Sequence, residues 1–318
     1  MLKFKPILKS TIWGGDKIVK FKRMDSQQSH VGESWEISGI PGFESIVSEG
    51  EHAGLSLNQL VSQMGDRLLG ADNHQRFGNA FPLLVKFIDA CDDLSIQVHP
   101  DEETARRQGK GDGKTEMWYA LQSEPEAYLY NGLRQAITPE CCKSMATDGT
   151  ICDALVRYGV SEGEVFYIPA GCIHSIGKGC FVVEIQQASD VTYRLFDFMR
   201  RGKDGKPREL HLDEAAESIH YQSMPENHVH YSQKKNEGVE LVRCPWFTTS
   251  VYDLDEPMVI DYSDLDSFVI LIGVKGNGVV VDDEGHSTSL CAGEVVLLPA
   301  CTNEIKVEGE VRFLETYV

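Results

Sequence analysis

Residues 94–121 read LSIQVHPDEETARRQGKGDGKTEMWYAL, a strand-like segment that leads through a polar loop into a second apolar segment. Side chains two residues apart in an extended strand point to the same side, so Gln97 and His99 share one face. Glu116 stands where the second apolar segment begins. We expect the amide, the imidazole and the carboxylate to meet on neighbouring strands, where together they can bind one metal ion.

A fourth candidate ligand, His174, follows another strand pattern and a corner formed by Pro169 and Gly171. Nitrogen and oxygen donors without sulfur leave zinc, iron(II), manganese, nickel and cobalt open as the bound metal. Each residue also has a purely structural interpretation. A histidine in a β protein is often only hydrogen-bonded, Gln97 can be an ordinary polar strand residue, and Glu116 can pair with a nearby lysine.

Composition narrows the classes of partner. The 318 residues carry a formal net charge of -19, which would repel a phosphodiester backbone and an anionic membrane surface, so neither nucleic acid nor membrane is an expected partner. No apolar run is long enough to span a bilayer, and the first residues lack the apolar core of a signal peptide. Nine cysteines, an odd number without a Cys-x-x-Cys pair, favour reduced thiols. We therefore expect a soluble, cytoplasmic protein.

Short apolar runs dominate the chain and predict a mainly β fold. The expected strands cover residues 81–88, 94–99, 117–121, 127–130, 164–168, 181–186, 268–274, 279–282 and 294–298. Helix signals are fewer: one helix begins near Ser56, a second begins with Thr138 as cap and Pro139 in its first turn, and a third covers 213–219.

The chain contains one short internal repeat, GEVFYIPA at residues 163–170 and GEVVLLPA at 293–300. In both copies a glycine turn, an apolar strand and a proline corner follow one another, which predicts two related β-barrels or sandwiches. The polar segment 220–238 separates the two β-rich parts and is the expected boundary. Residues 276–278, Gly-Asn-Gly between apolar runs, predict a hairpin turn in the second part.

The spacing around His174 resembles the second signature of the cupin superfamily, in which a proline and a glycine turn the chain before a histidine that points into a β-barrel. Lys178 stands where that signature usually ends in asparagine. The first cupin signature, His-x-His followed closely by Glu, is resembled with two departures. Gln97 replaces the first histidine, and sixteen residues separate His99 from Glu116.

These departures are typical of the type I phosphomannose isomerases, also called mannose-6-phosphate isomerases, which the chain resembles over much of its first two-thirds. The matching segments are Trp13-Gly14-Gly15, Gly32-Glu33-Ser34-Trp35-Glu36, Pro82-Leu83-Leu84-Val85-Lys86, residues 94–100, Lys114-Thr115-Glu116-Met117-Trp118 and Ser189-Asp190-Val191-Thr192-Tyr193-Arg194. The resemblance is to the short form of the family and implies two cupin-like β-barrel (jelly-roll) domains. It implies a metal-binding catalytic domain over 1–235, with a small helical insertion near 138–158. A cupin-like domain over 236–318 would hold no metal, since Glu304 stands at the position of His174.

The resemblance implies a metal-dependent aldose–ketose isomerase that interconverts mannose 6-phosphate and fructose 6-phosphate through a cis-enediol. One Zn²⁺ per chain would be held by Gln97, His99, Glu116 and His174, although other divalent metals suit the same ligands. The charge that develops on the enediol needs an electrophile close by, and a metal with an open coordination position supplies one. The expected partner is a small sugar phosphate.

The resemblance also implies that Trp13, Lys86, Ser95 and Arg194 contact the substrate. An acidic protein must concentrate positive charge locally to hold a phosphate group, and a guanidinium fork fits its oxygens. The structural alternatives are that Lys86 is an amphipathic strand lysine and that Arg194 pairs with Asp197.

We expect Arg194, Glu184 and Lys114 to carry the catalytic step. Glu184 is a candidate base if burial raises its pKa, and Lys114, Asp190 and a metal-bound water compete for this role. Glu184 could instead orient His174 as a partner of the metal ligand.

Two other functions remain open at this point, an iron-dependent cupin oxygenase and a non-catalytic sugar-phosphate-binding cupin. The lysines and arginines predicted near the site favour the isomerase. The sequence His228-Val229-His230 has the spacing of metal ligands, but it lies in the polar segment without an evident partner carboxylate, so we interpret it as a surface pair.

Overall fold

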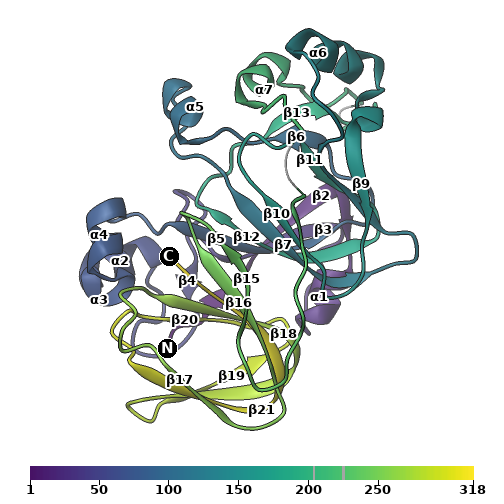
Figure 1. The fold of residues 1–318 in the computed structure, drawn as a ribbon. Coiled ribbons are helices and arrows are strands. Elements are labelled where there is room, and N and C mark those ends of the chain that lie inside the picture. The colour runs from purple at the N-terminus through teal and green to yellow at the C-terminus, as the bar shows by residue number, and fades with distance from the viewer. Residues whose placement is uncertain (203–204, 224–225) are drawn as a thin grey trace.

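The computed structural model describes residues 1–202, 205–223 and 226–318, and consists of two β units that lie side by side (Figure 1). The first unit contains most of the chain, and the second is formed by the C-terminal strands. The mainly β fold expected from the short apolar runs is confirmed. No helix in the described part of the chain is long and apolar enough to cross a membrane.

The first unit contains a seven-stranded and a five-stranded sheet, with strand orders β14-β10-β7-β12-β5-β3-β2 and β13-β6-β11-β8-β9. The strands of the larger sheet are β2 (Ile7–Gly15), β3 (Val31–Ile37), β5 (Leu83–Asp89), β7 (Glu116–Ser123), β10 (Val165–Ile168), β12 (Cys180–Gln187) and β14 (His228–Val229). Those of the smaller sheet are β6 (Ile96–Val98), β8 (Tyr128–Leu133), β9 (Leu155–Gly159), β11 (His174–Ile176) and β13 (Tyr193–Phe196). A buried apolar cluster with residues from both sheets, including Trp118, Phe166 and Ile176, fills the space between them.

The second unit has the strand order β15-β16-β21-β18-β19, with β17 paired to β21 and β20 paired to β18. These strands are β15 (Val239–Arg243), β16 (Thr248–Leu254), β17 (Met258–Asp261), β18 (Val269–Asp282), β19 (Ser287–Cys291), β20 (Val295–Leu298) and β21 (Glu304–Tyr317). A small separate sheet pairs β1 (Phe4–Lys5) with β4 (Ile46–Val47). The backbone of Leu2 hydrogen-bonds to that of Leu297, so the start of the chain packs on the second unit.

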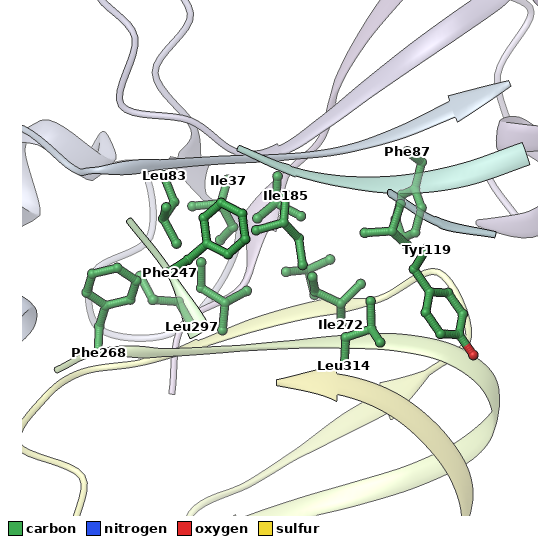
Figure 2. Packing of buried hydrophobic residues seen from close by; sticks show 14 of the residues in the cluster. Ile37, Leu83, Phe87, Tyr119, Ile185, Phe247, Phe268, Ile272, Leu297 and Leu314 are labelled. Carbon is green, nitrogen blue, oxygen red and sulfur yellow. The ribbon is translucent and has the colours of Figure 1, made fainter. Parts of the chain in front are cut away.

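The central strands of the larger sheet are buried on both faces, which explains why they read as continuous apolar runs. One face carries residues such as Leu83, Phe87, Tyr119 and Ile185, which pack against the second unit; Figure 2 shows these residues above its strands. The alternate residues face the interior of the first unit. Because successive side chains point to opposite faces, the same strands both join the two units and carry polar residues inward.

The helices are short and lie at the edges of the β units. They are α1 (Lys17–Phe21), α2 (Leu57–Met64), α3 (Asp66–Leu69), α4 (Ala71–Phe77), α5 (Glu102–Arg107), α6 (Pro139–Asp148) and α7 (Leu212–Ser218), with a 3₁₀ turn at Ile151–Ala154. Ser56 caps α2 in a capping box, and Thr138 caps α6 with Pro139 in its first turn, as predicted. Helices α5, α6 and α7 gather at the end of the first unit that is distant from the second (Figure 1).

The repeated octapeptide has the same local structure in both units. Gly163 and Gly293 have φ values of 87° and 88°, and each precedes a four-residue strand, β10 or β20, by two residues. The hairpin turn predicted at 276–278 is wrong. These residues lie inside β18, which stays paired with β21 through Asn277. Gly276 has a φ of 76° just after the register shift between Gly273 and Lys275, and the nearby backbone of Glu310 leaves no room for a Cβ.

Candidate active site

The structure brings together the four residues predicted as metal ligands. Gln97 lies in β6, and His99 follows directly after this strand. Glu116 begins β7 and His174 begins β11. The strand registers explain the convergence, since His174 lies opposite Gln97, while Glu116 lies opposite Ile168 in β10.

The distances between these side chains match the edges of a small coordination polyhedron. The Nε2 atom of His99 lies 3.5 Å from Oε2 of Glu116, and Nε2 of His174 lies 3.4 Å from Oε1. The amide nitrogen of Gln97 lies 3.3 Å from Nε2 of His174. Two ligands bound about 2.0–2.1 Å from a tetrahedral zinc lie roughly 3.3–3.4 Å apart. The donors are therefore spaced as one ion would require.

Both imidazoles are held in the orientation and tautomer that a metal needs. Nδ1 of His99 lies 2.8 Å from the carbonyl oxygen of Val191, and Nδ1 of His174 lies 2.9 Å from that of Cys172. A carbonyl oxygen can only accept, so each Nδ1 carries the proton and donates it. Each Nε2 then presents a lone pair toward Glu116.

The side chain of Gln97 completes the set after a rotation of its amide. Ser95 Oγ donates a hydrogen bond of 3.2 Å to Oε1 of Gln97, whereas the amide nitrogen faces His174. Turning the amide by 180° would place Oε1 beside the histidine as a ligand and let the amide donate to Ser95. Ser95, predicted as a substrate contact, thus also orients Gln97.

The electrostatics of the cluster favour a cation. Glu116 is fully buried, and neither of its carboxylate oxygens has a hydrogen-bond partner of good geometry, although the ammonium of Lys114 lies 3.1 Å from Oε2. Burial raises the pKa of Glu116, and the nearby Glu184 raises it further. Burial lowers the pKa of His174 to about 4 and that of His99 well below its ordinary value, so both rings are neutral. A buried carboxylate that faces two neutral imidazoles, with the Lys114 ammonium as its nearby cation, fits a divalent metal ion.

The ligand set borders a polar cavity of about 310 Å³, toward the small end of the range for ligand pockets. Besides Gln97, it is lined by Trp13, Glu33, Lys86, Ile88, Leu94, Ser95, Lys114, Ile176, Glu184, Asp190, Thr192, Arg194, Arg208 and His211. The predicted substrate-binding and catalytic residues are all in this lining. Lys114 Nζ lies 3.1 Å from Nε2 of His99 and so touches both the cavity and the ligand set.

Two predicted site residues, Lys86 and Glu184, form a buried ion pair across β5 and β12. Lys86 Nζ lies 2.9 Å from Oε1 of Glu184, and Oε2 accepts a hydrogen bond of 2.9 Å from the indole of Trp118. Although burial alone would raise the pKa of Glu184, Lys86 and then Lys114 lower it to about 2. The sequence suggested Glu184 as a base only if burial raised its pKa. Its pKa is lowered instead, so this requirement is not met. Lys86 is committed to its partner instead of being free for a phosphate group.

The cavity contains a second arginine that the sequence did not indicate. Arg194 and Arg208 both line it, and burial followed by the charge of Arg208 lowers the pKa of Arg194. Arg208 also donates a hydrogen bond of 3.2 Å to Asp197, which Arg200 shares at 2.5 Å. Arg194 does not pair with Asp197 as the structural alternative suggested; its Nε donates to the carbonyl oxygen of Glu209. Two guanidinium groups in the lining of one cavity favour an anion there.

Glu33, Thr192 and His211 also line the cavity and were not singled out from the sequence as site residues. Glu33 lies within the matching segment at residues 32–36, so its position in that motif was the available signal. Arg208 and His211 reach the cavity because the backbone of His211 hydrogen-bonds to that of Arg194. No periodicity in residues 197–211 predicts this return of the chain.

The chain is similar to known proteins along almost all of its length. Residues 1–130 match the model of the phosphomannose isomerase type I catalytic domain, and residues 238–318 match that of the mannose-6-phosphate isomerase cupin domain. The chain is 35% identical to mannose-6-phosphate isomerase ManA of Bacillus subtilis (strain 168), over 96% of this chain and 95% of the relative. The chain belongs to the type I phosphomannose isomerase family.

Other phosphomannose isomerases are also similar to this chain in sequence or in structure. The mannose-6-phosphate isomerase of Streptococcus mutans is 31% identical over 96% of this chain and 94% of its own length. A crystal structure of the mannose 6-phosphate isomerase from Bacillus subtilis superposes with a TM-score of 0.89 at 27% identity, covering 100% of this chain and 99% of the other. A variant of the Salmonella typhimurium phosphomannose isomerase, 17% identical with a TM-score of 0.82 and coverage of 100% and 99%, shares the fold. The chain is thus an aldose–ketose isomerase, and the oxygenase and binding-protein alternatives are not favoured.

Proposed function

We propose that the chain interconverts mannose 6-phosphate and fructose 6-phosphate, with one zinc ion held by Gln97, His99, Glu116 and His174. The observation that carries this proposal is the buried carboxylate of Glu116, which has the Lys114 ammonium 3.1 Å away and whose two oxygens face the lone pairs of two imidazoles beside a polar cavity. The names of the curated relatives support the substrate. A reducing compartment such as the cytoplasm suits the nine free cysteines.

The metal would supply an electrophile close to the C1 and C2 oxygens of the open-chain sugar. Zinc is favoured because imidazole nitrogen and carboxylate oxygen are its usual ligands at this spacing. Ser95 would hold the Gln97 amide with its oxygen toward the ion, and the carbonyl groups of Val191 and Cys172 keep the two histidines in the required tautomer.

Arg194 and Arg208 would bind the phosphate group of the substrate. Their mutual repulsion is relieved when a dianion lies between them, and the planar guanidinium groups can each donate two hydrogen bonds to phosphate oxygens. Trp13 contributes an apolar surface to the same cavity. The phosphate would thus fix the sugar with its reacting end toward Lys114 and the metal ligands.

Isomerisation requires a group that moves a proton between C1 and C2, and such a group works best with a pKa near the working pH. The ion pair with Lys86 takes Glu184 far below that range. Lys114 is buried, lines the cavity and lies beside two of the proposed ligands, whereas Asp190 is exposed. On the ground of its position, we assign proton transfer to Lys114, and we assign a positioning role to Glu184, which holds Lys86 and Trp118.

The proposal is tested with purified protein treated with a chelator and then dialysed. Conversion of mannose 6-phosphate is measured by a coupled assay for fructose 6-phosphate, before and after addition of one equivalent of Zn²⁺. We expect activity to disappear with the metal and to return with zinc. An undiminished rate in a sample shown to be free of metal would overturn the proposal.

A further inference from the structure

A second group of potential metal ligands lies outside the cavity. Within the described ranges, only two groups of three or more His, Cys, Asp and Glu side chains have all their ligand atoms within 4.8 Å of one another. The first is His99, Glu116 and His174, and the second is Glu226, His228 and His230. The surface-pair interpretation of the two histidines assumed that they had no partner carboxylate, and the structure shows that this assumption is wrong.

The backbone explains why the two imidazoles meet. His228 and Val229 form β14, the edge strand paired with β10. Val229 packs against the large apolar cluster that joins the two β units. Since neighbouring residues in a strand point to opposite faces, His228 and His230 both point away from that cluster. Their ring centroids are 4.5 Å apart.

The distances resemble those in the active site. Nε2 of His230 lies 3.5 Å from Oε1 of Glu226, close to the edge length expected for two ligands of one tetrahedral ion. Nε2 of His228 lies 3.4 Å from Oε1 of Glu164, which contacts this histidine but is not among the three residues whose ligand atoms all lie within 4.8 Å of one another. Two imidazoles and a carboxylate are a donor set that zinc, cobalt, nickel and copper(II) accept.

One of the ligands is already fixed in position. The ring of His228 stacks on Phe166 with a centroid distance of 4.6 Å and an interplanar angle of 13°, and Tyr158 contacts it edge-on at 5.7 Å. The other oxygen of Glu164 accepts a hydrogen bond of 2.7 Å from the backbone of Ser161, which directs Oε1 toward His228. Glu226 and His230 are largely exposed and can move to close the site.

We propose that Glu226, His228 and His230 bind a second divalent transition-metal ion. The ligands come from β14 and the residues on either side of it. A bound ion would therefore hold Glu226 and His230 against the edge strand of the larger sheet. The site borders a separate surface cavity of about 290 Å³, and it does not depend on the function proposed for the first cavity.

The test counts bound metal by two independent routes. Metal-free protein is titrated with Zn²⁺ against a chromogenic chelator, and metal content is measured after desalting. We expect two ions per chain in the natural protein and one in the double variant His228→Asn/His230→Asn. The double variant His99→Asn/His174→Asn should also keep one ion, and a Co²⁺ titration should report the remaining site by its visible spectrum.

His286→Asn is the matched control. His286 also contacts two carboxylates, Asp282 and Glu284, but it is a single exposed histidine, so this variant should keep both ions. Because His228 is packed on Phe166, the exposed single variants His230→Asn and Glu226→Gln are tested alongside, with circular dichroism to check folding. One ion in the natural protein that is retained in His228→Asn/His230→Asn, or two ions retained in all variants of this cluster, would overturn the proposal.

Discussion

Both β units contain the glycine turn, short strand and proline corner of the repeated octapeptide, but their interiors contain different residues. In the first unit the strand β10 and its proline corner lead to His174, which is fully buried beside other polar groups. In the second unit the equivalent strand β20 leads to Glu304, which is exposed, and the interior is filled by apolar residues such as Leu271 and Val280. The same backbone therefore supports chemistry in one unit and stability in the other, because buried charges stabilise a fold much less than apolar packing does.

Replacing the histidine at the first corner should have the largest effect on activity. His174→Ala removes a ligand and is expected to lower kcat/KM on the order of 10³-fold or more, since an electrophile at a developing negative charge contributes several kcal/mol. Metal content should fall with it. Glu304→Ala, at the matching position of the second unit, should leave both quantities unchanged. A His174→Ala protein that keeps its metal would contradict the assignment.

A substitution in the core of the second unit should instead lower stability and leave activity unchanged. Leu271 is fully buried, and Leu271→Ala should lower the free energy of unfolding by about 2–5 kcal/mol through lost burial and the cavity left behind. Urea unfolding monitored by circular dichroism measures this loss. At a temperature where the variant remains folded, kcat/KM should equal that of the natural protein. A large fall in the activity of the folded variant would show that the second unit contributes to the site.

Replacing Arg208, one of the two arginines that line the cavity of the first unit, should affect substrate binding more than the chemical step. Hydrogen bonds to charged groups contribute about 1.5–3 kcal/mol, so Arg208→Ala should raise KM roughly 10- to 100-fold with a smaller change in kcat. Arg200 still pairs with Asp197 in this variant, which limits structural damage. Steady-state kinetics with Arg208→Lys as an intermediate case provide the check. An unchanged KM would place the phosphate elsewhere.

The smallest expected effect concerns the buried carboxyl group of Glu315 in the second unit. Burial raises its pKa, with the hydroxyl of Tyr262 as hydrogen-bond donor at 2.6 Å. A raised pKa in the folded state means that this group's contribution to stability is full at low pH and is lost as pH rises through the folded pKa. Glu315→Gln keeps an acceptor for Tyr262 and cannot ionise.

Glu315→Gln should therefore be more stable than the natural protein at pH 8, and the difference should vanish near pH 4. Urea midpoints at the two pH values measure this. The exposed Glu304→Gln serves as control and should show no such difference. Equal midpoints at pH 8 would show that Glu315 does not oppose folding when ionised.

The sequence was sufficient for features that local pattern determines. The apolar runs of β7, β10 and β12 and the caps of α2 and α6 follow from periodicity and from single capping residues. The ligand candidates followed from strand alternation in β6 and from the proline corner before His174. These signals lie within a few residues of one another, so no knowledge of tertiary structure is needed to read them.

Features that depend on pairing between distant segments could not be read in this way. The Lys86–Glu184 ion pair joins residues 98 positions apart and is set by the register of β5 with β12. That pair reverses the pKa shift expected for Glu184 from burial alone. Arg208 lies in the cavity although no periodic pattern in the sequence places it there, and β18 continues through glycines that locally favour a turn, because β21 pairs with it along its length.

Anomalous scattering at the zinc edge from crystals of the natural protein tests the central claim most directly. The account predicts a strong peak bounded by Gln97, His99, Glu116 and His174, with each ligand atom about 2.0–2.2 Å from it. A well-ordered cavity in zinc-loaded crystals without a peak among these four side chains would contradict the account.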